Sequence, residues 1–410
     1  MKSFFFDDSE LPAKPKTRRK RAGAGCDACG LHRHCESPKM KPHGSSQMGI
    51  VVVAEAPGKK EDETGIPLVG PAGKFLNSSM IRMGLDLDND CVKLNVIQCR
   101  PTDKRGNNRH PAPEEILACR PRVDRQIKAA EPDLIFAFGT PAIAEILRDA
   151  PFSPNATTMH GRVVPSPKWG CWVACGLHPS WYLHGQNKKH WRRMDDVVKA
   201  GLKELDSGPY EDTRLDPAKY ELVEDFDRAM GLMKEWENND EATAFDYETN
   251  GFDPWMAAPR ILTGAWATNP GHGWCIPFEH PFARWNAEQL QQLFNGLRRW
   301  LSSPCSKVIQ NRQFEEVWSR VVLGTEIENV EADTMVMAHV LDNRPGVCSQ
   351  QFQEFVRYGE SGHKKMVNPA RLEQEFLDTI ARYTCLDVRY DIRIHHDQER
   401  EIENQTSLEK

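Results

Sequence analysis

The sequence predicts an α/β protein with two domains, an α/β/α sandwich with a parallel sheet followed by a domain with a mixed sheet. A chain of 410 residues is long enough to bury two cores. Runs rich in Val, Ile and Leu alternate with helical stretches up to residue 206, which is typical of a parallel sheet covered on both faces. Charge also divides the chain: residues 1–210 hold 32 Lys and Arg against 24 Asp and Glu, whereas residues 211–410 hold 21 against 35.

This composition indicates a globular protein that acts inside the cell. A basic half suits a phosphate backbone, and an acidic half suits bound cations or simple solubility. The longest apolar runs are too short to cross a bilayer, and the three phenylalanines at 4–6 are too short for a signal peptide, so we expect no membrane partner and a cytoplasmic location. Twelve cysteines in a long intracellular chain favour metal binding over disulfides.

The first domain is expected over residues 25–206, after a flexible basic arm at 1–24 that mixes Pro, Lys and Arg. Apolar runs predict strands at 49–55, 92–98, 133–139 and 171–178. Helices are expected to begin near Pro71, Pro113, Pro141 and Gln186.

Residues 207–220 carry turn residues and charge without periodicity, which predicts a linker. The second domain is expected over 221–410. It begins with a meander of strands at 243–249, 261–268 and 273–278, and a further strand is predicted at 307–311. Helices are expected over 286–300, 312–322, 333–342 and 370–397, whereas residues 344–369 have no readable pattern.

Three polar residues stand where predicted strands of the first domain end: Glu55, Asn95 and His178. In a parallel sheet such ends meet at one crevice. An amide can read both the donor and the acceptor edge of a base, and a neutral imidazole can donate to oxygen charge that develops during a reaction. These groups suit the cleavage of an N-glycosidic bond with a pyrimidine leaving group.

Four cysteines surround these motifs. Cys26 and Cys29 form a CxxC pair, a spacing that lets two thiolates reach one iron–sulfur cluster or one zinc. Cys99 and Cys119 follow in two further segments, so a site that uses all four joins distant parts of one domain.

Residues 26–204 resemble the iron–sulfur (family 4) uracil-DNA glycosylases. The resemblance covers three blocks: AEAPGKKEDETGIPLVGPAG from Ala54, NVIQCRP with PEEILACRPRVDRQI from Asn95 to Ile127, and His178-Pro179. The chain departs from the family pattern at Leu68, where the family has a phenylalanine that stacks on the base, and at Ala54, where it has glycine.

This resemblance implies a site and a substrate. Cys26, Cys29, Cys99 and Cys119 would hold a [4Fe–4S] cluster, and Ala56, Glu61, Leu68 and Asn95 would line the base pocket, with Glu55 and His178 as catalytic residues. The substrate would be DNA, either single-stranded or with the target base flipped out of the stack.

The second domain offers a pattern of carboxylates. Asp246 and Glu248 lie two apart on a predicted strand, and Tyr383 and Asp387 lie four apart on a predicted helix, so each pair shares a face. Such carboxylates can hold two divalent cations for phosphodiester hydrolysis, and Tyr383 could orient the attacking water.

Residues from about 240 to 400 resemble the DnaQ-like, ribonuclease H-like 3′–5′ exonuclease domains of family A DNA polymerases. FDYET, QNRQFEE with ADTMVMAHVLD, and YTCLD match the three motifs of that family. The resemblance implies two Mg²⁺ or Mn²⁺ ions held by Asp246, Glu248, Glu315 and Asp387, with Tyr383 as catalytic helper; Glu315 stands where the family has aspartate.

A glycosylase-like domain before an exonuclease-like domain resembles the N-terminal part of certain phage-type DNA polymerases. We therefore expect base excision combined with proofreading, and the host cytoplasm as the location if a phage encodes the chain. Either a separate DNA polymerase subunit is a partner, or this chain is a split or truncated version of a longer polymerase. The alternative is a uracil-sensing or strand-binding accessory module with weak catalysis.

Overall fold

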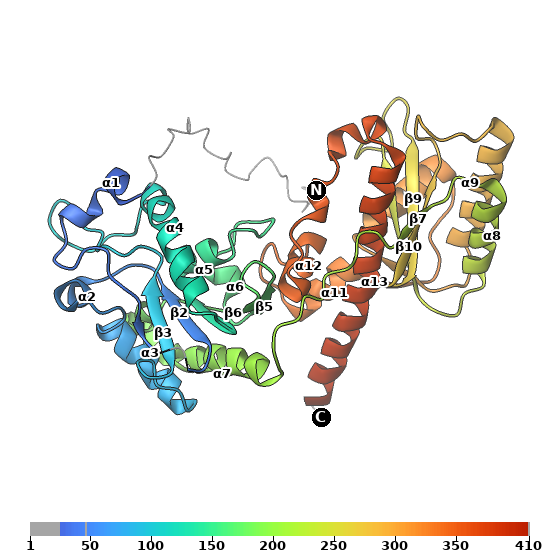
Figure 1. Ribbon diagram of the computed structural model, residues 1–410. Helices are drawn as coiled ribbons and strands as arrows, with labels where there is room; N and C mark the ends of the chain where they lie inside the picture. Colours follow the sequence, from blue (N-terminus) through green and yellow to red (C-terminus); the bar gives the residue numbers. More distant parts are fainter. Residues whose placement is uncertain (1–24, 46, 409–410) are drawn as a thin grey trace.

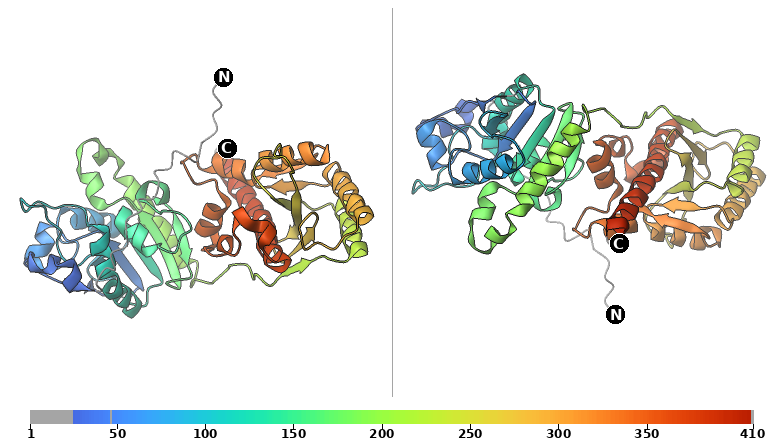
Figure 2. Two further views of the ribbon diagram at one scale, coloured as in Figure 1. Left: turned by 90° about the horizontal axis from the view of Figure 1, so that it is seen from above. Right: turned by 90° about the horizontal axis from the view of Figure 1, so that it is seen from below.

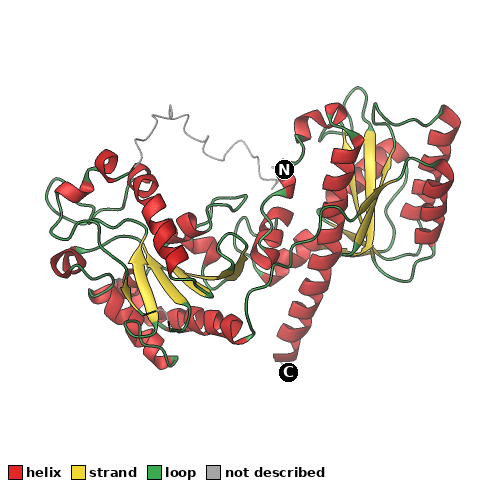
Figure 3. Ribbon diagram, viewed as in Figure 1, coloured by secondary structure: helices red, strands yellow, loops and turns green. Residues whose placement is uncertain are grey.

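The computed structural model describes residues 25–45 and 47–408, which form two α/β units joined by an extended segment (Figure 1, Figure 3). Each unit is built around a six-stranded sheet. The expected basic arm at 1–24 lies outside the described residues. Within the described ranges, none of the helices is both long and apolar enough to cross a membrane.

Four parallel strands make the middle of the first sheet, namely β2 (Ile50–Ala54), β3 (Cys91–Asn95), β4 (Leu134–Phe138) and β6 (Cys171–Gly176). The short strands β1 (His43–Gly44) and β5 (Val163–Ser166) pair antiparallel at its two edges. Every residue of β2 and β4 is buried, as expected for strands covered on both faces. The predicted parallel sheet is confirmed.

Helices cover both faces of this sheet, which makes the predicted three-layer sandwich. α3 (Pro71–Arg82) and α7 (Arg192–Asp206) pack on one face, and α4 (Pro113–Ala129) and α5 (Thr140–Ile146) pack on the other. Both α3 and α4 begin with proline, whose fixed φ suits the first helical position. Short helices fill the connections: α1 (Cys26–Cys29), η2 (Leu31–Arg33), α2 (Lys59–Thr64), α6 (Ala156–Met159), η3 (Pro179–Leu183) and η4 (Gly185–His190).

The second sheet is mixed, as the sequence predicts. Strands β8 (Thr243–Thr249), β9 (Ile261–Asn269) and β10 (His272–Pro277) form the antiparallel meander. Beyond β8 lie the parallel strands β11 (Lys307–Ile309) and β12 (Val330–Asp333), and β7 (Tyr220–Leu222) pairs parallel with β10 at the other edge.

One face of the second sheet packs against α8 (Phe226–Glu237) and α9 (Ala287–Leu301), and the other packs against the long helix α13 (Leu377–Leu408) (Figure 1). The remaining helices are α10 (Arg312–Trp318) with the π-helix η5 (Ser319–Leu323), α11 (Thr334–Leu341), η6 (His363–Lys365) and η7 (Pro369–Gln374). Helix α13 begins at Leu377, after η7, so the helix predicted over 370–397 is divided at its start.

Helix α12 (Gln350–Tyr358), which lies in the stretch without a readable sequence pattern, joins the two units (Figure 1, Figure 2). Phe352 and Phe355 belong to the core of the first unit, where their rings lie 4.8 Å and 5.4 Å from that of Phe152. We keep 25–206 and 221–410 as proposed domain limits, with α12 a part of the second domain that enters the core of the first.

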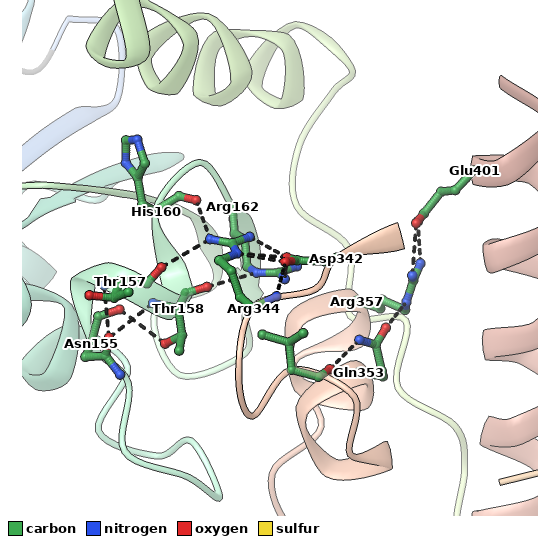
Figure 4. Close-up of polar contacts among 11 residues, drawn as sticks. Asn155, Thr157, Thr158, His160, Arg162, Asp342, Arg344, Gln353, Arg357 and Glu401 are labelled. Carbon is green, nitrogen blue, oxygen red and sulfur yellow. Dashed lines mark hydrogen bonds and ion pairs between the residues drawn. The ribbon is translucent and has the colours of Figure 1, made fainter. Parts of the chain in front are cut away.

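Polar contacts surround this junction (Figure 4). Arg162 forms an ion pair with Asp342, and Arg344 donates to the carbonyl oxygen of His160 at 2.9 Å. Arg357, on α12, donates to Glu401 on α13 at 2.5 Å. The apolar packing, the Arg162–Asp342 ion pair and the Arg344–His160 hydrogen bond join the two domains, and the Arg357–Glu401 contact joins α12 to α13 within the second domain.

Candidate functional site

A cavity of about 540 Å³ opens at the carboxyl ends of the first sheet. Its wall includes the predicted site residues Glu55, Ala56, Glu61, Leu68, Asn95 and His178. They come from the ends of β2, β3 and β6 and from α2 with the loop that follows it. The structure therefore brings together all the residues that the sequence assigns to base binding and glycosidic cleavage.

His178 is the N-cap residue of η3, directly after β6. Its Nδ1 accepts the backbone N–H of Ser180 at 3.3 Å and lies 2.7 Å from the Ser180 hydroxyl. A nitrogen that accepts a backbone N–H carries no proton in the neutral ring, so Nε2 carries it. Burial lowers the pKa of His178, which keeps the ring neutral at pH 7. The imidazole is thus a neutral donor in the wall of the cavity.

Asn95 ends β3 and is 2% exposed. Among the described residues, its side-chain nitrogen has no hydrogen-bond acceptor. A buried amide N–H without a partner is costly, so a ligand oxygen that accepts from it would bind favourably.

Glu55 has a neighbour that the sequence did not indicate. His110, from the loop between Cys99 and α4, places its Nδ1 2.6 Å from the Glu55 carboxylate. The Glu55 side chain is 15% exposed, whereas that of His110 is 90% exposed. Nothing in the local sequence distinguishes His110 from an ordinary loop residue, because the contact depends on how the loop folds back.

Glu61 and Leu68 shape the wall of the cavity. The two carboxylate oxygens of Glu61 accept the backbone N–H groups of Gly58 and Gly70 at 3.1 Å and 3.0 Å, so this side chain holds two loops together. Leu68 is buried at a φ of 55°, a conformation that side chains rarely adopt. Gly73 makes it possible, because a Cβ there would lie 1.7 Å from the carbonyl oxygen of Leu68.

The four predicted cluster cysteines come from α1, the loop after β3, and α4, and the structure brings their thiols near one another. Burial and the neighbouring thiols Cys99, Cys29 and Cys26 raise the pKa of Cys119 to about 11. Backbone N–H groups of Leu31, Lys39 and Gln98 donate to thiol sulfurs of this group, the first to Cys29 and the second to Cys99 at 3.2 Å. Four neighbouring thiols, three of which receive such donors, fit an anionic iron–sulfur cluster.

A fifth thiol, Cys35, contacts Cys99. Burial and the neighbouring Cys99 raise its pKa to about 12. From the sequence, Cys35 is expected to be an ordinary thiol, as most free cysteines are.

A second group of polar side chains lies between β8 and α13. Asp246, Glu248 and Asp387 place ligand atoms within 4.8 Å of one another. Burial and the Asp387 charge raise the pKa of Asp246 to about 7, and burial with Asp246 raises that of Glu248. Three carboxylates at this spacing, Asp387 buried and the other two half-buried, repel one another, and divalent cations bind such a set of donors.

Glu315 and Tyr383 adjoin these three carboxylates. The carboxyl group of Glu315, on α10, lies near Asp246; burial and the Asp246 charge raise its pKa, and its Oε2 has no partner within the described ranges. Tyr383 is 8% exposed on α13, and burial together with the Asp387 charge raises its pKa. The structure therefore brings together the four predicted ligands and the predicted helper.

Other buried groups in this region were missed by the sequence analysis. His363 Nε2 lies 2.7 Å from Asp387, and Lys364 forms an ion pair with the same carboxylate. Burial acts to raise the pKa of Asp387, but the charges of Lys364 and His363 outweigh it and lower that pKa. Both residues lie in the stretch without periodicity, so no local signal marks them.

Asp391, 1% exposed, lies one helical turn after Asp387. Burial and the charges of Asp246 and Asp387 raise its pKa. Its spacing of four from Asp387 is a signal that could have found it.

Comparisons with known proteins match the first domain to a known superfamily. Residues 41–200 match the model of the Uracil DNA glycosylase superfamily. The type-4 uracil-DNA glycosylase of Thermotoga maritima is 34% identical over 178 residues, which cover 43% of this chain and 87% of that protein. The corresponding protein of Pyrobaculum aerophilum is 40% identical over 114 residues, and this chain spans only 55% of its length.

A longer match covers both domains. The DNA polymerase of Bacillus phage SP01 is 22% identical over 328 residues, which cover 75% of this chain and 34% of that protein. Among solved structures, Escherichia coli RNase D, an exoribonuclease involved in structured RNA processing, is 16% identical with a TM-score of 0.34 over 45% of each chain. Brucella melitensis NrnC with bound Mg²⁺ is 16% identical with the same TM-score, over 46% of this chain and 81% of that one.

Proposed function

The chain belongs to the type-4 uracil-DNA glycosylase family, and we propose that it excises uracil or a modified base from DNA and also shortens DNA strands from the 3′ end. The two activities are assigned to the two domains. The match to a phage DNA polymerase over most of the chain supports a place in phage-type DNA replication, with a separate polymerase subunit as partner.

The observation that carries the excision proposal is the pair of donors in the first cavity. Asn95 has a buried N–H without a partner, and His178 has its proton on Nε2. A flipped base offers carbonyl oxygens that can accept both. As the glycosidic bond breaks, negative charge grows on the base oxygen, and a fixed neutral donor such as His178 stabilises that charge without needing to reorient.

Glu55 is the proposed partner of His178 in catalysis. Its carboxylate lies at the same end of the sheet, and a negative charge near the sugar stabilises the positive charge that develops there as the base leaves. Glu61 contributes to base binding by fixing the two loops that form the wall.

We assign the [4Fe–4S] cluster to Cys26, Cys29, Cys99 and Cys119. The convergence of four thiols and their backbone donors supports this assignment. When bound, such a cluster joins the distant segments of the domain and supplies no step of base excision.

In the second domain, we propose that Asp246, Glu248, Glu315 and Asp387 bind Mg²⁺ or Mn²⁺. Ions of this kind activate water and stabilise the leaving oxygen of a phosphodiester. The three carboxylates within 4.8 Å of one another support this proposal. The Tyr383 hydroxyl lies 3.4 Å from the Lys364 ammonium, which pairs with Asp387. At this position beside the site, the hydroxyl can orient water.

End-labelled single-stranded DNA with one uracil tests both activities. The protein is incubated first in EDTA and then in Mg²⁺, and abasic sites are cleaved with alkali. We expect cutting at uracil in EDTA, reduced roughly 10²–10³-fold in His178→Ala, the usual effect of losing one such donor. We expect progressive shortening from the 3′ end only in Mg²⁺, and its loss in Asp246→Asn.

The alternative function, a sensing or strand-binding module, is favoured by Leu68. A leucine in the cavity wall lacks the aromatic stacking that the family phenylalanine provides, about 1–3 kcal/mol per base. Tight binding of uracil-containing DNA without alkali-sensitive cutting would support this alternative and contradict the excision proposal.

A further inference from the structure

Lys364 brings a positive charge into the second site. Its side chain is 20% exposed, and its ammonium forms an ion pair with Asp387. The same ammonium donates to the Gln350 side chain at 2.9 Å and lies 3.4 Å from the Tyr383 hydroxyl. It is therefore surrounded by a metal-binding carboxylate, an amide and the proposed helper.

Two neighbours hold Lys364 in this position. Gln350, at the start of α12, accepts from Lys364 and donates to the backbone carbonyl of Asp387 at 2.9 Å. His363 lies 3.3 Å from Glu354 on the same helix and 2.7 Å from Asp387. The opposite face of α12 is packed in the core of the first domain. The position of Lys364 therefore depends on α12, on α13 and on the first domain.

These contacts limit what Asp387 can ligate. His363 Nε2 and Lys364 Nζ both contact the same carboxylate oxygen, Oδ1. A carboxylate oxygen offers about two lone-pair positions, so Oδ1 is saturated and Oδ2 alone remains for an ion. A pair of ions 3.5–4 Å apart concentrates positive charge at one site, and the Lys364 ammonium already supplies positive charge to one of the carboxylates that such a pair would use.

We propose that the Lys364 ammonium supplies a permanent positive charge to the second site. As a result, this site binds one divalent ion, whereas the motif pattern implies two. The ammonium supplies positive charge beside Asp387, and the single ion would be held by the proposed ligands Asp246, Glu248, Glu315 and the free oxygen of Asp387. This inference rests on the proposed exonuclease function.

The test counts Mn²⁺ ions bound to the full chain, from the electron paramagnetic resonance of free Mn²⁺ during a titration. The quantity compared is the number of ions lost in Asp246→Asn. Two other groups of side chains could also bind an ion, namely Glu331 with His395 and Glu399, and Glu354 with His363 and Asp387. We expect one such ion in the wild-type chain and two in Lys364→Met. Lys365→Met, which changes the exposed neighbour, is the matched control and should keep one.

The possible results distinguish a failure of the one-ion inference from a failure of the proposed metal site. Two Asp246-dependent ions in the wild-type chain, or an unchanged single ion in Lys364→Met, would overturn the inference alone. No Asp246-dependent ion in the wild-type chain would overturn the proposed metal site itself. If Lys364→Met does not fold, Lys364→Ala, which also removes both the donor and the charge, replaces it with the same expected count of two.

Discussion

At the scale of single residues, the first site depends on where the proton of His178 lies. The Ser180 backbone N–H and hydroxyl both face Nδ1, which leaves the proton on Nε2. Burial has the largest effect on this ring and disfavours the charged form, although Glu55 and Glu61 act in the opposite direction. A neutral donor can stabilise a developing anion over a wide pH range, because it does not have to be charged first.

The pH dependence of excision follows from this protonation state. Because the pKa of His178 is lowered below its ordinary value of about 6.5, the neutral form persists as the pH falls through 6.5. We expect the single-turnover rate of uracil excision in EDTA to stay constant from pH 8 to 6.5 and to fall only at lower pH. A midpoint at or above 6.5 would contradict the assignment, and the affinity for uracil-free DNA over the same range is the control.

At the scale of secondary-structure elements, α12 is the helix that serves both domains. One face places Phe352 and Phe355 in the first core, and another presents Gln350 and Glu354 to the second site. An element packed in this way transmits any shift of one domain to the side chains that it carries into the other. The second site should therefore depend on residues that never touch its substrate.

Phe352→Ala tests this dependence. Removing a buried phenylalanine costs about 3–5 kcal/mol, so we expect lower stability in urea and a loss of Mg²⁺-dependent shortening that exceeds the loss of uracil excision. Val340→Ala, at a side chain that is 68% exposed on α11, should change stability by less than about 0.5 kcal/mol. Equal losses of both activities, in proportion to unfolding, would contradict the role assigned to α12.

At the scale of the whole molecule, the two domains meet through apolar packing surrounded by charged groups (Figure 4). The Arg162 guanidinium lies 4.9 Å from the Phe352 ring and forms an ion pair with Asp342. The His160 Nδ1 accepts a hydrogen bond from the backbone N–H of Leu177 at 3.3 Å, and the His160 carbonyl oxygen accepts one from Arg344. Burial, followed by the charges of Arg193 and Arg344, lowers the pKa of His160 to about 4.

This shift predicts a loss of stability in weak acid. The unfolded chain takes up a proton at His160 near pH 6.5, whereas the folded chain does so only near pH 4, so the free energy of unfolding falls between these values. The contribution is at most about 3 kcal/mol. We expect His160→Asn to have a shallower decline than the wild-type chain in urea unfolding between pH 6.5 and 4. Parallel declines would show that His160 does not resist protonation in the folded state.

Much of each site could be predicted from local spacing. Some features depend only on the geometry of one element or one loop. These are the strand before Glu55, the CxxC of Cys26 and Cys29, and the alternation of Asp246 and Glu248. The strand ends then place Glu55, Asn95 and His178 together, because carboxyl ends of parallel strands meet at one edge of a sheet. Such features can be read without knowing where the rest of the chain lies.

The sequence by itself thus determined the two sheets, the family resemblances and the residues that face the cavity and the acidic cluster. Only the tertiary structure decided the contact of His110 with Glu55, the placement of α12 in the first core, and the ion pair of Lys364 with Asp387. The physical reason is that helical and strand periodicity arises from the burial of one face of a single segment. Contacts between residues far apart in the chain, such as Arg162 with Asp342, arise from packing and leave no repeating pattern in either segment.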